Sequence, residues 1–402
     1  GSADNAGGPL VSTGDCVLRV RVQSSGPGDW SLVRSNSTVG GGGDLETLPE
    51  LFPARGAVAE INPENPTFGQ IFLSLSSGGS GGTHGVLRLF ADLALVEGGA
   101  LILDDLDWVE AGESDESPWG MAVAPDGEIW ASGQGDVEIA RGQPDGTGDT
   151  DVGGVEPSVL SPRDVLLVGS GSGRVLRWIQ GNQTEGAVFR APIGDASTLS
   201  GVTVIKEIDG SSGQGFFGRG LASDDAGNIY LLVGDPQPLG FTDVYRFDAA
   251  TLAAGPWPLD VSQASWNVTV DGGASLRGSG IAIDRGDQTD PDDDIVYALV
   301  PLSSSFGEEA GIYRVGISGT ASLVTTVGSA ERVVDLSAEV LSDQLTDLAC
   351  DFGGNLILED PFNEVVWVFS PPGPSDLTVP GPSSEILAVS GEPPEKSGLL
   401  FR

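Results

Sequence analysis

The residues best suited to chemistry in this chain are carboxylates crowded into two loops. One loop carries Asp145, Asp149 and Asp151, separated by glycine and threonine. The other, residues 287–294, holds five acids in eight positions: Asp287, Asp290, Asp292, Asp293 and Asp294. Calcium takes about six to eight oxygen ligands from flexible loops of this kind. Neither loop has the EF-hand spacing, so two interpretations stay open, a calcium site in one or both loops or solvated acidic turns.

Other candidate catalytic groups are few. His84 is the only histidine and lies in a glycine-rich stretch, residues 78–85, where we expect a surface loop residue although an imidazole could act as a general base. Any histidine-dependent triad would need this one residue. No Gly-x-Ser-x-Gly elbow leads into a helix, because residues 169–173 are typical of a turn between strands. The sequence therefore assigns no catalytic and no cofactor-binding residue.

The charge balance restricts the partners. The chain has 19 Lys and Arg against 58 Asp and Glu, a formal charge of −39. A polyanion repels phosphate backbones and anionic head groups, so we expect neither nucleic acid nor a membrane surface as partner. No apolar run approaches the roughly 20 residues that span a bilayer. Cations, basic proteins and neutral glycans stay open, and a solvated surface that resists aggregation also explains the charge.

The elements that must position these residues are indicated by a recurring phrase, at residues 121–130, 221–230 and 348–357. In each copy an apolar strand meets a turn with Asp and Gly, and a second strand follows, which predicts a hairpin. Further copies start near residues 56, 164 and 280, the last with a turn expanded over residues 285–294. An alternating third strand follows at 85–90, 243–248, 311–316 and 364–369, and a fourth, edge strand is expected in places, as at 321–327.

Repeated units of this kind bury their faces only by stacking on their neighbours, and four antiparallel strands repeated radially make a propeller blade. We predict an all-β protein, a β-propeller over residues 51–373 with six four-stranded blades, or alternatively seven. Residues 1–50 and 374–402 would supply closing strands, including an N-terminal hairpin over 16–22 and 30–33 and a late strand at 384–389. A shared closing blade removes open sheet edges. No helix longer than a turn or two is expected.

Residues 220–230 read Gly-Leu-Ala-x-Asp-x-x-Gly-Asn-Ile-Tyr, and residues 243–248 read Asp-Val-Tyr-Arg-Phe-Asp. Over about residues 50–373 the chain resembles the NHL and SMP-30/gluconolactonase-like β-propellers, which implies their fold. That superfamily includes lactonases, lyases and binding modules, so fold alone does not choose a function. Its lactonases hold a divalent metal with Glu, Asn and Asp from inner strands. Glu60 might correspond to the Glu by position, whereas no Asn or Asp matches, since Asn228 and Asn355 lie in hairpin turns.

Two cysteines, Cys16 and Cys350, have neither CxxC spacing nor a nearby histidine, which argues against zinc or haem. They are two buried thiols or one disulfide, and ring closure would bring them together. With few lysines and long polar loops, a disulfide would suit an exported bacterial protein, extracellular or periplasmic, and we expect a monomer. Of eight tryptophans, we expect Trp130, Trp178 and Trp367 between blades, and exposed ones could stack on sugars.

The inner strands begin Gly-Met-Ala, Gly-Leu-Ala, Gly-Ile-Ala and Asp-Leu-Ala, which are mostly small and apolar. A propeller enzyme should instead converge several polar residues from different blades at the channel mouth. We therefore expect a non-enzymatic binding or scaffold module that contacts a protein or glycan through the loops of one rim, with calcium as its expected cofactor. A channel-site hydrolase or lyase of the SMP-30/lactonase type is the alternative.

Overall fold

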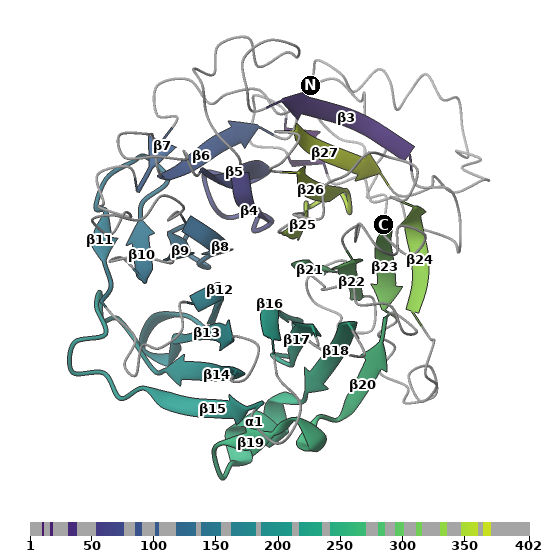
Figure 1. Ribbon diagram of the computed structural model, residues 1–402. Coiled ribbons are helices and arrows are strands. Elements are labelled where there is room, and N and C mark those ends of the chain that lie inside the picture. Colours follow the sequence, from purple (N-terminus) through teal and green to yellow (C-terminus); the bar gives the residue numbers. More distant parts are fainter. Residues whose placement is uncertain are drawn as a thin grey trace, which may run out of the picture.

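A computed structural model describes residues 10–11, 17–18, 31–37, 54–75, 85–90, 101–103, 118–133, 138–153, 162–181, 186–210, 217–234, 242–270, 280–285, 294–300, 311–315, 330–335, 347–360 and 365–370. Within these residues the chain forms sheets that follow one another around a central axis (Figure 1). The structure is a β-propeller, the fold that the resemblance implied.

The first three sheets run outward from the axis in chain order. The first contains β4 (Ala54–Ala59), β5 (Gln70–Leu75), β6 (Gly85–Phe90) and β7 (Leu101–Ile102). The second contains β8 (Pro118–Val123), β9 (Ile129–Gly133), β10 (Ile139–Gly142) and β11 (Thr150–Asp151). The third contains β12 (Pro162–Val168), β13 (Val175–Gly181), β14 (Gly186–Ala191), β15 (Ile205–Asp209) and β19 (Leu259–Asp260), with the short 3-10 turn η1 (Gly171–Gly173) between β12 and β13.

The next three sheets continue the ring. The fourth contains β16 (Phe217–Ser223), β17 (Ile229–Gly234), β18 (Thr242–Phe247) and β20 (Trp266–Thr269). The fifth contains β21 (Gly280–Asp284), β22 (Ile295–Val300), β23 (Gly311–Val315) and β24 (Ala330–Asp335). The sixth contains β25 (Leu348–Cys350), β26 (Leu356–Asp360), β27 (Val365–Ser370) and, as its outer strand, β3 (Ser31–Ser37).

The recurring phrase forms hairpins, as predicted. Met121 pairs with Ala131, Leu221 with Leu231 and Leu348 with Leu358, all in antiparallel register. In each hairpin the first strand is the innermost of its sheet, and the second lies next to it. The phrase thus places one short apolar strand per sheet beside the axis.

The described structure differs from the sequence analysis, or adds to it, at three places. Among the described residues, β3 pairs with β27 and covers its edge, while β2 (Val17–Leu18) pairs with β1 (Leu10–Val11), so β2 and β3 do not pair with each other as the predicted N-terminal hairpin required. A helix, α1 (Ala249–Ala254), follows Asp248 and ends at Gly255, and the 3-10 turn η2 (Val261–Gln263) comes after it. The fourth strand of the fifth sheet is β24, later than the predicted 321–327. That range and the predicted late strand at 384–389 lie outside the described residues.

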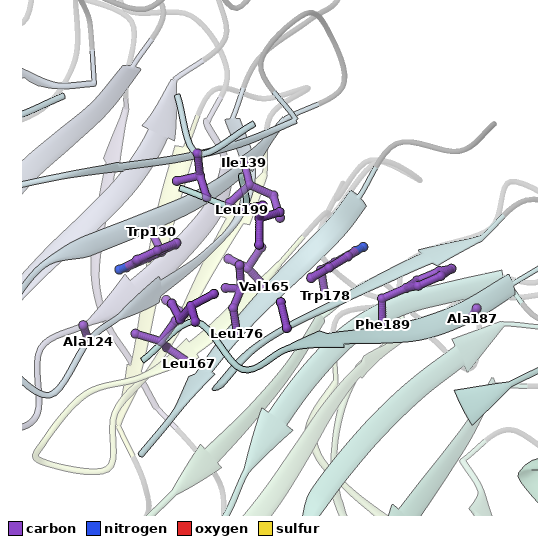
Figure 2. Packing of buried hydrophobic residues seen from close by; sticks show 14 residues of the cluster. Ala124, Trp130, Ile139, Val165, Leu167, Leu176, Trp178, Ala187, Phe189 and Leu199 are labelled. Atoms are coloured by element: carbon purple, nitrogen blue, oxygen red, sulfur yellow. The ribbon is translucent and has the colours of Figure 1, made fainter. Parts of the chain in front are cut away.

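The core lies between neighbouring sheets. Figure 2 shows the contact between the second and third sheets, where Trp130 and Trp178 are both fully buried, as expected. Trp178 stacks on Phe189 with ring centroids 5.7 Å apart. Trp367 lies half-buried between the fifth and sixth sheets. Because a strand alternates its side chains, each inner strand serves two such contacts, and each fully buried large apolar side chain contributes about 1.5–3 kcal/mol.

Candidate functional site in the central channel

A cavity of about 430 Å³ runs along the axis. It is lined by the innermost strands of the six sheets around the axis, β4, β8, β12, β16, β21 and β25, which surround the centre of Figure 1. Most of its wall is small and apolar, such as Ala59, Val123 and Ile283. Channels of this size with a few convergent polar groups are the usual form of a small-molecule site.

The heads of the six inner strands follow a pattern that repeats after three sheets. The equivalent positions, each directly before an apolar residue of an inner strand, are Gly56, Gly120, Asp164, Gly220, Gly280 and Asp347. The two acids belong to the third and sixth sheets, whose inner strands β12 and β25 face each other across the axis in Figure 1. One end of the channel therefore carries two carboxyl groups on opposite sides, and both line the cavity.

Each of these carboxyls bridges two sheets. Asp164 Oδ2 accepts the N–H of Leu221 in the fourth sheet at 2.7 Å, and its Oδ1 accepts the following N–H at 2.8 Å. Asp347 Oδ2 accepts the N–H of Ala57 in the first sheet at 3.0 Å, and its Oδ1 accepts the following N–H at 2.8 Å. Backbone N–H groups at the strand heads thus donate hydrogen bonds to carboxylate side chains rather than to the backbone of a neighbouring strand.

Glycine at the other heads allows a closer approach of the next strand. A Cβ added to Gly280 would lie 2.4 Å from the nitrogen of Leu348, and one added to Gly56 would lie 1.7 Å from the oxygen of Trp119. No side chain fits at such distances. The six positions are therefore of two kinds. At the glycines the neighbouring sheet approaches closely, and at the aspartates a carboxyl group forms a hydrogen bond to the neighbouring sheet.

Burial changes the acidity of the pair. It raises the pKa of Asp347 to about 7. It also raises the pKa of Asp164 well above its usual range, and the negative charge of Asp347 raises it further. Removal of water disfavours the charged form of an acid, and a second carboxylate adds to this effect. The titrations of the two groups are therefore linked, and both pKa values lie above the usual range of an aspartate.

The opposite end of the channel holds Glu60. This buried carboxyl accepts the N–H of Asn62 at 2.7 Å and the Nδ2–H of Asn65 at 2.6 Å, and burial raises its pKa. Both partners belong to the hairpin turn that follows β4. Glu60 thus lines the channel as the lactonase resemblance implied, and both hydrogen bonds to its carboxylate come from its own blade.

The Gly-Asn pairs brace hairpin turns. Asn228 donates from Nδ2 to Asp224 at 2.7 Å, and Asn355 donates from Nδ2 to Asp351 at 2.7 Å. Neither asparagine lines the channel. This agrees with the sequence analysis, in which these residues could not supply the missing metal ligands.

The predicted calcium ligands are spread over separate places. Asp145 accepts the N–H of Thr147 at 3.0 Å, and Asp151 accepts that of Gly153 at 2.8 Å, whereas Asp149 packs against Gly142. In the second loop the structure describes only one of the predicted ligands, and the others, like His84, lie outside the described residues: Asp287, Asp290, Asp292 and Asp293.

Asp294 is fully buried, and its Oδ2 accepts the N–H of Asp225 at 3.2 Å. Burial raises its pKa to about 7. Within the part of the chain that the structure describes, no three His, Cys, Asp or Glu side chains form a metal-binding group. Calcium therefore stays a proposal.

The structure does not support the predicted disulfide. Cys350 is a buried thiol on β25, packed between the fifth and sixth sheets, and its Sγ lies 3.6 Å from the carbonyl oxygen of Asp351. Cys16 lies outside the described residues. The alternation of β25 turns this side chain toward an apolar contact between blades.

Sequence reasoning missed the pairing of Asp164 with Asp347. The signal was present, because Asp164 and Asp347 stand where the other four repeats have glycine. Their meeting across the axis depends on the order of the sheets around the ring.

Within the described residues, no helix is long and apolar enough to cross a membrane.

No protein-family model and no curated protein matches this sequence. Similar solved structures include the WD40 β-propeller domain of Doa1, with 12% identity over 85% of this chain and 96% of that one, and a TM-score of 0.44. A structural genomics protein of unknown function from Bacteroides thetaiotaomicron VPI-5482 is 13% identical over 85% and 75%, with a TM-score of 0.49. A glucose dehydrogenase is 13% identical over 85% and 98%, with a TM-score of 0.48. The likeness is one of fold alone.

Proposed function

We propose that this chain is an exported, non-enzymatic β-propeller of six blades that acts as a binding module, with the central channel as its ligand site. The observation that carries the proposal is the channel itself, an apolar wall from six inner strands with Asp164 and Asp347 opposite each other at one end. Apolar walls supply affinity, and a few fixed polar groups supply orientation.

Contacts between the sixth and first sheets support a ring of six. Their inner strands share one buried cluster, in which Ala57 and Leu73 pack with Ile357 and Val368. The rings of Phe68 and Phe352 meet edge to face across the same junction, with centroids 4.5 Å apart. The bond from Ala57 to Asp347 joins the strand heads there. A seventh blade between these sheets would separate all three contacts.

Calcium is part of this proposal as a stabiliser of the second acidic loop. Asp294 ends that loop, and burial already disfavours its charge. Asp224 and Asp225 repel it further, and Arg285 attracts it. A bound cation would offset the repulsion among the loop carboxylates.

The larger partner would be a protein or glycan bound by loops on one rim. The formal charge of −39 favours a basic protein over nucleic acid or a membrane surface. We also propose that the protein is exported to the periplasm or the cell exterior and that it is a monomer.

A crystallographic fragment screen tests the channel as the ligand site. We expect small amphiphilic fragments to occupy the channel more often than any rim position. Fragments found only on the rims would contradict the proposal. The alternative, a channel hydrolase or lyase, is favoured by the buried Glu60, and turnover in a panel of lactones and esters that is lost in Glu60→Gln would establish it instead.

A further inference from the structure

Two acids line one end of the channel, the buried Asp164 and the half-buried Asp347. The negative charge of Asp347 raises the pKa of Asp164, and no described basic side chain shifts the pKa of either acid. Arg163, the neighbour of Asp164 in sequence, places its guanidinium over the ring of Trp119, 4.1 Å from the centroid. Arg285 lies at the other end of β21, 3.2 Å from Ser223 Oγ. The described side chains therefore leave this charge uncompensated.

Such a pair requires a third group. Buried carboxylates are stable only when they are paired, hydrogen-bonded or neutralised, and like charges close together in a poorly solvated place cannot both stay ionised at low cost. The backbone N–H groups of Leu221 and Ala57 supply part of the compensation. The rest must come from a proton or from a cation inside the channel.

We propose that Asp164 and Asp347 together bind the positive head of a small organic cation, an alkylammonium or arylammonium, whose hydrocarbon part lies against the apolar channel wall. This inference rests on the proposed function, in which the channel is a ligand site. In the unliganded protein a proton takes the place of the cation, so binding of the cation displaces a proton.

A hard divalent ion fits this place less well. Calcium needs about six to eight oxygen ligands, and magnesium a near-ideal octahedron. Here both oxygens of Asp164 and both of Asp347 already accept backbone N–H groups, and the surrounding wall includes Ala57, Met121 and Ile281. An ammonium group needs only a few acceptors, and its carbon chain gains from the apolar wall.

Isothermal titration calorimetry with benzylammonium chloride and benzyl alcohol tests the inference on the unmodified protein. The two probes share size and shape and differ in charge. We expect benzylammonium to bind at least about tenfold more tightly at pH 8, a difference of about 1.4 kcal/mol. Its affinity should fall by up to about tenfold per pH unit below pH 7, because protons compete for the pair, whereas that of the alcohol stays constant.

Variants locate the site. Asp164→Asn and Asp347→Asn should each abolish the preference for the charged probe. Asp351→Asn, which removes a buried carboxyl of the same blade that does not line the channel, should keep it. Thermal melts check that each variant is folded. Because the probe comparison needs no variant, failure of a variant to fold does not remove the test.

The outcomes separate the two proposals. Equal binding of both probes in the channel overturns the cation inference and leaves the proposed function standing. A charge preference that persists in both Asp→Asn variants also overturns the inference, because the cation then binds elsewhere. If neither probe binds, the cation inference fails. The fragment screen then tests separately whether the channel is a ligand site.

Discussion

Asp347, at the head of the innermost strand of the sixth sheet, accepts the backbone N–H of Ala57 in the first sheet at 3.0 Å. These residues are 290 positions apart in sequence. Asp164 makes the equivalent bond to Leu221 at the junction of the third and fourth sheets. Two aspartates on opposite sides of the channel thus join neighbouring sheets, and the same two carboxyls face the cavity.

The first prediction concerns the pH dependence of stability. The pKa of Asp347 is raised to about 7 in the folded protein, so its favourable contribution is complete below pH 4 and is lost as the pH rises through 7. The slope is at most about 1.4 kcal/mol per pH unit for one proton. Asp347→Asn loses one acceptor, at a cost of about 1–3 kcal/mol, but does not titrate. Denaturant melts from pH 4 to 8 should show the gap between wild type and variant narrowing as the pH rises. A constant gap would contradict the assignment.

The second prediction concerns the glycine heads. Gly280→Ala should lower the free energy of unfolding by about 1–3 kcal/mol, because the new Cβ would lie 2.4 Å from the Leu348 nitrogen and push the fifth and sixth sheets apart. Gly173→Ala is the matched control, since its Cβ would meet no atom within 4 Å. Equal effects of the two substitutions in urea melts would show that the close approach at Gly280 does not matter.

The third prediction concerns the hairpin brace. Asn355→Ala should destabilise the protein by about 1–3 kcal/mol, because it removes the side-chain bond to the buried Asp351. That bond lowers the pKa of Asp351, which burial sets at about 6, so the variant should titrate at a higher pH by NMR. Asn267→Ala, at an exposed position of β20, is the control. An unchanged Asp351 titration in Asn355→Ala would rule out this role.

The fourth prediction concerns the outer strand of the sixth sheet. Removal of residues 1–37 deletes β3 and exposes the edge of β27, so the truncated protein should melt at lower temperature and self-associate. Removal of residues 1–29 keeps β3 and is the control. Light scattering after size-exclusion chromatography reports the association. If the longer truncation stays monomeric and equally stable, β3 is dispensable.

The fifth prediction concerns calcium. At free calcium about 100 times its dissociation constant, binding should add about 2.7 kcal/mol to the free energy of unfolding. Thermal melts should compare calcium with sodium at equal ionic strength, since salt alone screens the loop. Asp294→Asn should reduce the rise in melting temperature that calcium causes. The same measurement on Asp145→Asn shows whether the first acidic loop contributes to that rise. A melting temperature that chelation leaves unchanged would contradict both sites.

The sequence alone determined the repeating hairpin and its fold, because alternation of apolar residues and the chemistry of Asp-Gly turns are local properties. Residues 121–130 and 348–357 therefore predicted strands that the structure confirms. The helix at 249–254 was missed although Asp248 and Gly255 are good end signals, because six residues are too few to show a helical period.

Only the tertiary structure decided which distant residues meet. The strand of Ser31–Ser37 pairs with Val365–Ser370, more than 300 residues away, and no local sequence pattern in either segment predicts this pairing. The facing of Asp164 and Asp347 depends on the order of sheets around the axis. Their raised pKa values depend on burial and on each other, which are properties of the assembled channel. The local sequence pattern determines the strands, whereas the channel site forms only when the sheets pack against one another.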